Sequence, residues 1–210
     1  MSAPALARDA LADARERARD ALAPLAAACA AEGMPPLALD GQLIRPVLAF
    51  AAAEALGIGG GEPLACAALA VQLAHEASLV HDDIVDGAGV RRGRQTAAAA
   101  SGVGPALVLG DHLLAWGYRL AARTGSLAFV QAYADAVERT IAGEVEQGRA
   151  AGRRLDAEAC ERISRAKAGA LLGCAAAAGP LLAGHADAYA VRDLGVRLGL
   201  VYQMLDDLLD

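Results

Sequence analysis

The chain of 210 residues has few aromatic residues and no stretch that is typical of a β-strand. Phe, Trp and Tyr together make up 3% of it, and no segment is rich in the β-branched and aromatic residues that strands favour. Ala and Leu dominate instead, and both are strong helix formers. The composition therefore predicts an all-α protein in which small side chains allow helices to pack closely.

The sequence also lacks a basic stripe, a C-x-x-C motif, a signal peptide and a membrane-spanning run, and each absence excludes a class of protein. The net charge is −6 without a basic stripe, which argues against a nucleic-acid partner. The four cysteines show no C-x-x-C spacing and are typical of core thiols in a reducing cytosol. Charged residues are spread over residues 8–20, unlike in a signal peptide, and no uncharged run is long and apolar enough to span a bilayer. We expect a cytoplasmic protein with no transmembrane segment.

Apolar stretches separated by Gly and Pro predict seven helices and one helical domain over residues 1–210. Short connections between long helices are typical of an antiparallel bundle. The connection 87–96 is basic and is expected to be a loop, and Gly179 with Pro180 is expected to break a helix. The expected helices are 3–31, 42–56, 62–86, 104–123, 127–150, 156–178 and 187–210.

Two copies of a D-D-x-x-D pattern are the most informative feature that is present. They are Asp82-Asp83-Ile84-Val85-Asp86 and Asp206-Asp207-Leu208-Leu209-Asp210. On a helix, the first and last Asp of each copy lie one turn apart on the same face. Two carboxylates about 4 Å apart repel by about 4 kcal/mol at an effective dielectric constant near 20. A cation would offset this repulsion, and oxygen ligands with a substrate phosphate suit Mg²⁺.

The alternative is that each Asp cluster is simply a solvated helix face. Two copies, each flanked by aliphatic residues, make that alternative weaker than it would be for one. If the two helices face one another across the bundle, six carboxylates converge at one mouth. Such a mouth could hold several Mg²⁺ ions and a diphosphate between them.

Several further segments, taken in order, resemble the trans-type polyprenyl diphosphate synthases. The resemblance covers about residues 38–210, and the ordered set is more specific than any single motif. The matching segments are residues 75–86, Arg91-Arg92-Gly93, Gly110-Asp111-His112-Leu113-Leu114, Glu144-Val145-Glu146-Gln147, Lys167-Ala168-Gly169-Ala170-Leu171 and Tyr202-Gln203 before Asp206-Asp207.

The resemblance implies an isoprenoid-synthase helix bundle and a Mg²⁺-dependent prenyltransferase. Such an enzyme ionises an allylic diphosphate, the double bond of isopentenyl diphosphate attacks the allylic cation, and a proton is then lost, with the released pyrophosphate as its expected acceptor. The apolar bundle shields the cation from water. The resemblance also implies a homodimer, or a hetero-oligomer with another synthase subunit.

The resemblance assigns roles to individual residues. Arg91 and Lys167 would grip the allylic diphosphate, with Gln203 nearby. Arg45, His75 and Arg92 would face the diphosphate of the isopentenyl unit. Catalysis would rest on the first Asp motif with Asp206, Lys167 and Arg91. The expected metal ligands are Asp82, Asp83, Asp86, Asp206, Asp207 and Asp210.

The chain departs from the family at two places. Gln42 and Leu43 replace a lysine and an arginine that bind isopentenyl diphosphate in the family, and charge-assisted hydrogen bonds are worth about 1.5–3 kcal/mol each. Family members also continue with further helices past the second motif, so we expect either a fragment or a shortened member. These departures leave two alternatives open: a diphosphate-ionising enzyme that does not elongate, such as a terpene-cyclase-like relative, or a truncated regulatory subunit.

Small residues one turn before the first motif bear on product length. Ala77 and Ser78 are expected to form the floor of the product pocket, unless they only allow close helix packing. An open floor predicts a product of geranylgeranyl length or longer. Trp116, on a neighbouring predicted helix, could close the pocket further down.

Overall fold

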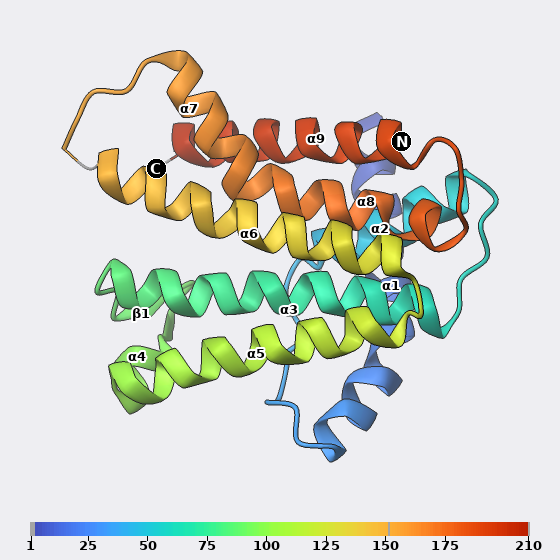
Figure 1. Cartoon of the computed structure of the whole chain (residues 1–210), viewed down its shortest axis with the longest axis horizontal. Helices are drawn as coiled ribbons and strands as arrows, with labels where there is room; N and C mark the ends of the chain where they lie inside the picture. The colour runs from blue at the N-terminus through green and yellow to red at the C-terminus, as the bar shows by residue number, and fades with distance from the viewer. Residues whose placement is uncertain (1–2, 151, 210) are drawn as a thin grey trace.

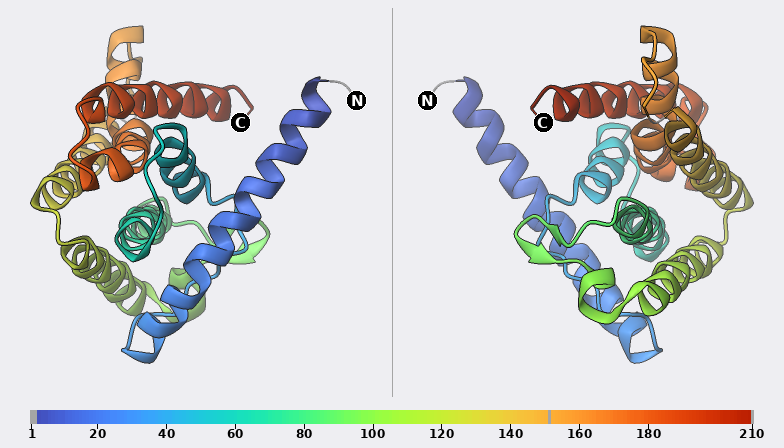
Figure 2. Two further views of the ribbon diagram at one scale, coloured as in Figure 1. Left: turned by 90° about the vertical axis from the view of Figure 1, so that its right-hand side faces the viewer. Right: turned by 90° about the vertical axis from the view of Figure 1, so that its left-hand side faces the viewer.

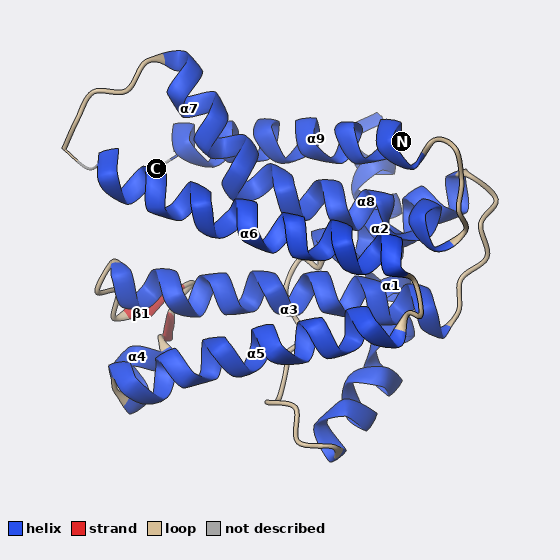
Figure 3. Cartoon of the chain, viewed as in Figure 1, coloured by secondary structure: helices blue, strands red, loops and turns tan. Residues whose placement is uncertain are grey.

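The structure is a computed structural model that describes residues 3–150 and 152–209, and the side chains of residues 8–150 and 152–205. The described residues form nine α-helices, one π-helix and a two-stranded hairpin (Figures 1 and 3). The elements are α1 (Ala3–Ala31), α2 (Ile44–Ala55), α3 (Glu62–Val85), β1 (Val90–Arg91), β2 (Arg94–Gln95), α4 (Ala97–Ser101), α5 (Val103–Arg123), α6 (Leu127–Ala150), α7 (Ala157–Ser164), η1 (Arg165–Gly169), α8 (Ala170–Leu182) and α9 (Ala188–Leu209).

The central element of the bundle is α3, which packs against α5, α2, α8 and α6. An unbroken run of its residues, Leu64 to Ala74, is buried. By length and composition, α3 is the one described helix that could cross a membrane, but 67% of its apolar window is buried inside the bundle. That burial is typical of the core helix of a folded domain. The all-α fold class predicted from composition is confirmed.

The helix α1 crosses the outside of the bundle obliquely (Figure 2). It buries Ala18, Leu22, Ala26 and Cys29, which recur every three or four residues and so share one face. Arg19 Nε on the same helix donates a hydrogen bond to the Leu39 carbonyl oxygen at 2.7 Å. The helix therefore also anchors the connection that leads into α2.

The helix α9 lies unusually close to α8 because glycines face one another. A Cβ atom added to Gly199 would lie 2.6 Å from Gly169 Cα, and one added to Gly195 would lie 2.6 Å from the Leu172 carbonyl oxygen. Any larger side chain at these positions would therefore clash with backbone. This contact determines where α9 carries the second Asp motif.

Two predictions for the segment 156–182 are wrong. The expected single helix 156–178 contains a π-helix, η1, between α7 and α8. The expected break at Gly179 and Pro180 is absent, because α8 continues to Leu182 with Pro180 buried inside it. At Gly179 the helix lies so close to α2 that an added Cβ atom would come within 2.6 Å of Ala53 Cβ. This close packing offsets the cost of the backbone hydrogen bond that is lost because Pro180 has no N–H.

The expected loop 87–96 and the expected absence of strands also need correction. Val90 pairs with Gln95 and Arg91 with Arg94 in an antiparallel hairpin. Arg92 and Gly93 form its two-residue turn, and both have positive φ, 50° and 76°. Two consecutive positive φ values are typical of the turn that matches the twist of a hairpin. The hairpin is followed by α4, which the sequence did not predict and which Thr96 caps.

Candidate active site

The last turn of α3 and the residue after it carry the first Asp motif, whose members have different environments. Asp83 is buried and accepts a hydrogen bond from Arg91 Nε at 2.7 Å. Asp86 follows the helix, is exposed, and its N–H donates to the Asp82 carbonyl oxygen at 2.8 Å. Adjacent helical residues point about 100° apart. Asp83 therefore ties the hairpin to α3, while Asp82 lies on a different face.

Asp82 is half-buried and faces α6 and η1. The pKa of its carboxyl group is raised from 3.8 to about 6, first by burial, then by the nearby Glu144 carboxylate, with a smaller contribution from Asp86. Lys167 and Arg91 act in the opposite direction. Two further carboxylates and two cations thus act on Asp82 at the end of α3, and such a gathering of charges suits a charged ligand.

Lys167 lies on the π-helix and is held by two residues of α6. Its Nζ lies 2.7 Å from Glu144 Oε2 and 2.7 Å from Gln147 Oε1. The two elements come this close because Gly143 has no side chain; an added Cβ atom would lie 2.8 Å from Ala166 Cβ and 3.1 Å from the Lys167 backbone nitrogen. A π-helix is rare and is frequently found at functional sites. Here it presents Lys167 to the α3 carboxylates.

A separate cluster of positive charge lies beside α3, made of Arg45, His75 and Arg92. Burial lowers the pKa of Arg45 to about 10, against the stabilising effect of Glu76. The Arg45 Nε is buried without a hydrogen-bond partner among the described residues. Burial also lowers the pKa of His75 well below its ordinary value of 6.5, helped by Arg45, Arg92 and Arg91. A buried donor without a partner, next to the Arg92 guanidinium and the neutral His75 imidazole, is an arrangement that an anion would satisfy.

Gln42 and Leu43 contribute no charge to this cluster. Gln42 is exposed, and its carbonyl oxygen accepts a hydrogen bond from Arg15 Nε at 3.1 Å. Leu43 is 4% exposed and adopts a left-handed backbone conformation, with φ 48° and ψ 34°. A large residue in that conformation is strained. Leu43 therefore acts as a core residue that begins α2.

The second Asp motif is only partly described. Asp206 and Asp207 belong to α9, but their side chains lie outside the described part, as does the whole of Asp210. Gln203 is partly buried on the same helix. Among the side chains of residues 8–150 and 152–205, no group of three or more His, Cys, Asp or Glu could hold a metal ion. The roles of the six aspartates as metal ligands stay predictions.

A small cavity of about 30 Å³ lies inside the bundle one turn below the Asp motif. Ser78 and His81 of α3 line it, with side chains of α5, α6 and α8 such as Leu114, Thr140 and Leu171. Ala77 has no exposed surface and is not among the lining residues. The expectation that Ala77 and Ser78 both form a pocket floor therefore holds geometrically for Ser78 alone.

Sequence reasoning did not assign a role to two residues of this site. Glu144 and Gln147 contact Lys167 directly, and Glu144 also acts on Asp82. The signal was present, since both belong to the E-x-x-Q segment that resembles a family element. Their importance follows from the contact between α6 and η1, which no local pattern predicts.

Comparison with known proteins identifies the family. The Polyprenyl synthetase family profile matches residues 34–210, and the chain belongs to this family. An octaprenyl diphosphate synthase of Haemophilus influenzae is 36% identical over 176 residues, covering 81% of this chain and 52% of the relative. A geranylgeranyl diphosphate synthase of Mycobacterium tuberculosis is 36% identical over 180 residues, covering 81% and 50%. The chain thus spans about half the length of these curated relatives.

Solved structures share the fold. A polyprenyl synthetase from Streptomyces coelicolor has a TM-score of 0.84 and 30% identity, covering 95% of this chain and 66% of the other. A polyprenyl synthase from Caulobacter crescentus, complexed with calcium and isoprenyl diphosphate, has a TM-score of 0.82 and 30% identity, covering 93% and 64%. The predicted isoprenoid-synthase bundle is confirmed.

Proposed function

We propose that this chain carries the prenyltransferase activity of its family, condensing an allylic diphosphate with isopentenyl diphosphate. The observation that carries the proposal is the pair of charged sites beside α3. One joins Asp82 to Lys167 and Glu144, and the other joins Arg45 to His75 and Arg92. Two diphosphate substrates need two such sites, and the reaction needs no protein nucleophile.

The donor set at the first site fits Mg²⁺. Asp82 and Asp86 offer hard carboxylate oxygens, and burial with repulsion from Glu144 raises the pKa of Asp82, so a cation there relieves crowded negative charge. In the proposal, Asp206, Asp207 and Asp210 supply further ligands. Bound Mg²⁺ would neutralise the departing diphosphate. The Caulobacter relative was solved with calcium and isoprenyl diphosphate, which supports a divalent-cation site of this kind.

The chain's own residues would bind and orient the two substrates. Lys167 would exchange its contact with Glu144 for the allylic diphosphate and stabilise the charge that develops as the C–O bond breaks. Arg45 and Arg92 would bind the acceptor diphosphate, and His75, held neutral, can donate one hydrogen bond to it. The apolar side chains below Ser78 would exclude water from the allylic cation.

A second candidate function is diphosphate ionisation without elongation. The two replaced positions favour it: Gln42 is exposed but uncharged, and Leu43 is buried, so neither offers a cation to the acceptor diphosphate. The acceptor site therefore lacks two cations, whereas the ionising site keeps its charged residues. A regulatory subunit of another synthase is a third candidate. The carboxylates close to Lys167 argue against it, because a subunit without catalytic activity has no need of them.

Product analysis separates these candidates. The chain would be incubated with Mg²⁺, isopentenyl diphosphate and allylic diphosphates of several lengths. We expect elongated polyprenyl diphosphates. A cyclised hydrocarbon or an alcohol would support the second candidate, and no product would support a subunit without activity of its own.

We also propose that the protein forms a homodimer in the cytoplasm through the outer faces of α5 and α6. Val108 and Ile141 are more than half exposed there, and Leu107 and Val145 nearly so. Covering apolar side chains of this size is a common basis for association. Light scattering after size-exclusion chromatography would measure the mass, and Val108→Asp with Ile141→Asp should yield a monomer. A mass that these changes leave unaltered, or a stable complex only with another synthase subunit, would argue against the homodimer.

A further inference from the structure

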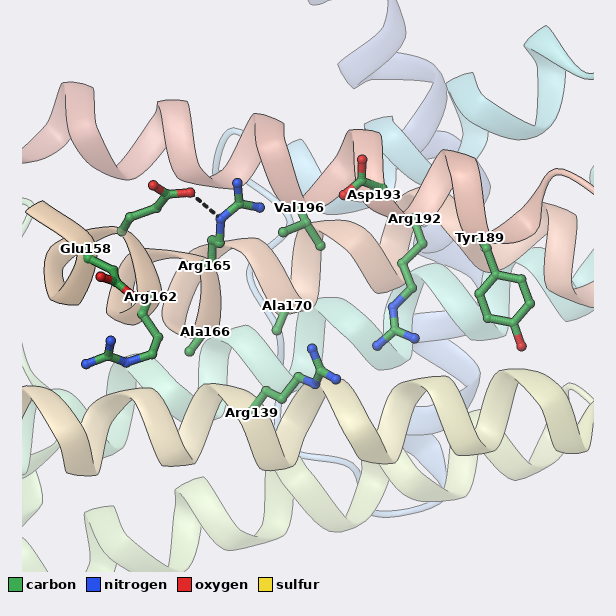
Figure 4. A pocket seen from close by; sticks show the side chains of 11 residues that line it. Arg139, Glu158, Arg162, Arg165, Ala166, Ala170, Tyr189, Arg192, Asp193 and Val196 are labelled. Atoms are coloured by element: carbon green, nitrogen blue, oxygen red, sulfur yellow. Dashed lines mark hydrogen bonds and ion pairs between the residues drawn. The ribbon is translucent and has the colours of Figure 1, made fainter.

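A groove on the outer face of the described residues lies away from the carboxylates of α3. It has a volume of about 740 Å³ and lies between α6, α7 with η1, and α9 (Figure 4). Its floor is made of the small side chains Ala166, Ala170 and Val196. A cavity of this size is within the range of small-molecule sites.

Four arginines line the groove, and they fall into two pairs. Arg162 and Arg165 are neutralised, because Arg162 pairs with Glu146 at 2.6 Å and Arg165 with Glu161 at 2.7 Å. Arg139 and Arg192 form no ion pair with any described carboxylate, although Glu158 and Asp193 also line the groove. Asp193 instead pairs with Arg197 at 2.6 Å.

The two arginines without ion pairs come from opposite walls. Arg139 extends from α6 and Arg192 from α9, and their guanidinium groups point toward one another across the floor (Figure 4). Two like charges held in this way repel each other, and an anion between them would remove the repulsion. Guanidinium groups bind phosphate in a bidentate geometry that suits two adjacent phosphoryl groups.

From this juxtaposition we propose that the groove is a second oxyanion site, which binds a diphosphate between Arg139 and Arg192. The ligand is either free pyrophosphate or the headgroup of an organic diphosphate whose alkyl part covers Ala170 and Val196. The site is independent of Mg²⁺, because its charge is supplied by arginines. Ala166 in its floor belongs to η1, so the bound anion lies beside the π-helix that carries Lys167.

Calorimetric titration in EDTA isolates this site from the one proposed for catalysis. The background is the full chain with Arg45→Ala and Lys167→Ala, which removes the two cations most central to the proposed substrate sites. Inorganic pyrophosphate is the first probe and dimethylallyl diphosphate is the second. We expect one saturable binding event that weakens as salt rises. Tighter binding of the second probe would assign an organic diphosphate, and equal binding would assign the free anion.

Three substitutions locate the event. Arg139→Gln and Arg192→Gln should each weaken it about tenfold or more, as expected for the loss of a charge-assisted contact. Arg149→Gln is the matched control, because Arg149 is exposed on the same helix as Arg139 but does not line the groove, and it should leave the affinity unchanged. Circular dichroism would verify that each variant folds. The proposal is overturned if the background shows no binding, or if binding is indifferent to both groove substitutions. A Mg²⁺-dependent event lost in Asp82→Ala tests the proposed function separately.

Discussion

Asp82 and Asp83 are neighbours in the sequence, yet their carboxylates serve different purposes in the structure. The Asp83 carboxylate accepts a hydrogen bond from Arg91, and this contact joins α3 to the hairpin. The Asp82 carboxylate lies beside Glu144 and Lys167 instead. In its contact with Asp83, Arg91 uses only its Nε, so its two terminal nitrogens can still bind a diphosphate, as the resemblance implies. The D-D-x-x-D pattern therefore locates the site, but it does not show which aspartate binds a metal ion and which one holds the fold together.

The first prediction follows from this difference. Asp82→Ala should lower turnover by about a hundredfold or more, the size of loss seen when one charge-stabilising group is removed. It should not lower the free energy of unfolding without metal, because it relieves repulsion with Glu144. Asp206→Ala is expected to have the same effect on turnover. Asp20→Ala, on the exposed face of α1, is the control. Near-normal turnover of either variant at saturating Mg²⁺ would refute the assignment.

His75 provides a prediction about pH. Its pKa in the folded protein lies well below 6.5 through burial and neighbouring arginines, so below pH 6.5 the unfolded chain takes up a proton that the folded chain does not. Stability should therefore fall as pH drops from about 7 to 5, by at most about 1.4 kcal/mol per pH unit from this group. Urea unfolding across this range would show a smaller decline for His75→Gln. An identical decline in both proteins would contradict the argument.

Gln42 and Leu43 should respond differently to the introduction of charge. From the family pattern alone, Gln42→Lys with Leu43→Arg restores the affinity for isopentenyl diphosphate. Because Gln42 is exposed and Leu43 is buried, we now expect Gln42→Lys alone to lower the Michaelis constant, by about tenfold. Leu43→Arg should mainly destabilise the fold, since it buries a charge. Steady-state kinetics of both single variants tests this, and no improvement with Gln42→Lys would remove position 42 from the acceptor site.

At the scale of elements, local signals predicted the long helices well and the short elements poorly. The bounds of α3, α5 and α6 differ from the expected ranges by one residue at most at either end, and α9 begins one residue later than expected, because Gly and polar residues mark these ends. The hairpin and α4 are two to five residues long, so they contain too few residues for a periodic signal. The π-helix and the continuation of α8 through Pro180 depend on contacts with other helices, which override local preference.

Close contact between η1 and α9 gives a prediction with a matched control. Gly199→Ala should destabilise the fold by about 1–3 kcal/mol, because its Cβ atom would press on Gly169 backbone that cannot move away. Gly148→Ala on α6 meets nothing within 4 Å and should instead stabilise by about 0.5–1 kcal/mol. Urea denaturation measures both. If both substitutions changed the free energy of unfolding in the same direction, close packing at Gly199 would not explain the result.

At the scale of the whole molecule, the site depends on the convergence of distant segments. The order of motifs implied that residues near 82 and 167 act together, but it did not reveal that Glu144 and Gln147 hold Lys167. That contact exists because Gly143 allows η1 to approach α6. Likewise, no sequence signal indicated that Leu43 is a buried core residue. Packing, unlike motif order, cannot be derived from one sequence.

The residues that line the interior of the bundle below Asp82 bear on product length. A chain that grows away from Asp82 enters the space between α3, α5, α6 and α8, where Ser78 lines the cavity and Ala77 does not. Trp116 is buried on α5 but also does not line this cavity. The residue that controls length is therefore expected at position 78.

Ser78→Phe should shorten the product, because an aromatic ring would fill the cavity that Leu114 and Leu171 line. Ala77→Phe serves as the comparison, because Ala77 is fully buried in the core and a ring there should cost about 1–3 kcal/mol through overpacking. The chain length of the products, measured by chromatography after dephosphorylation, decides the matter for protein that circular dichroism shows to be folded. An unchanged product distribution from folded Ser78→Phe would mean that the chain grows along another path through the bundle.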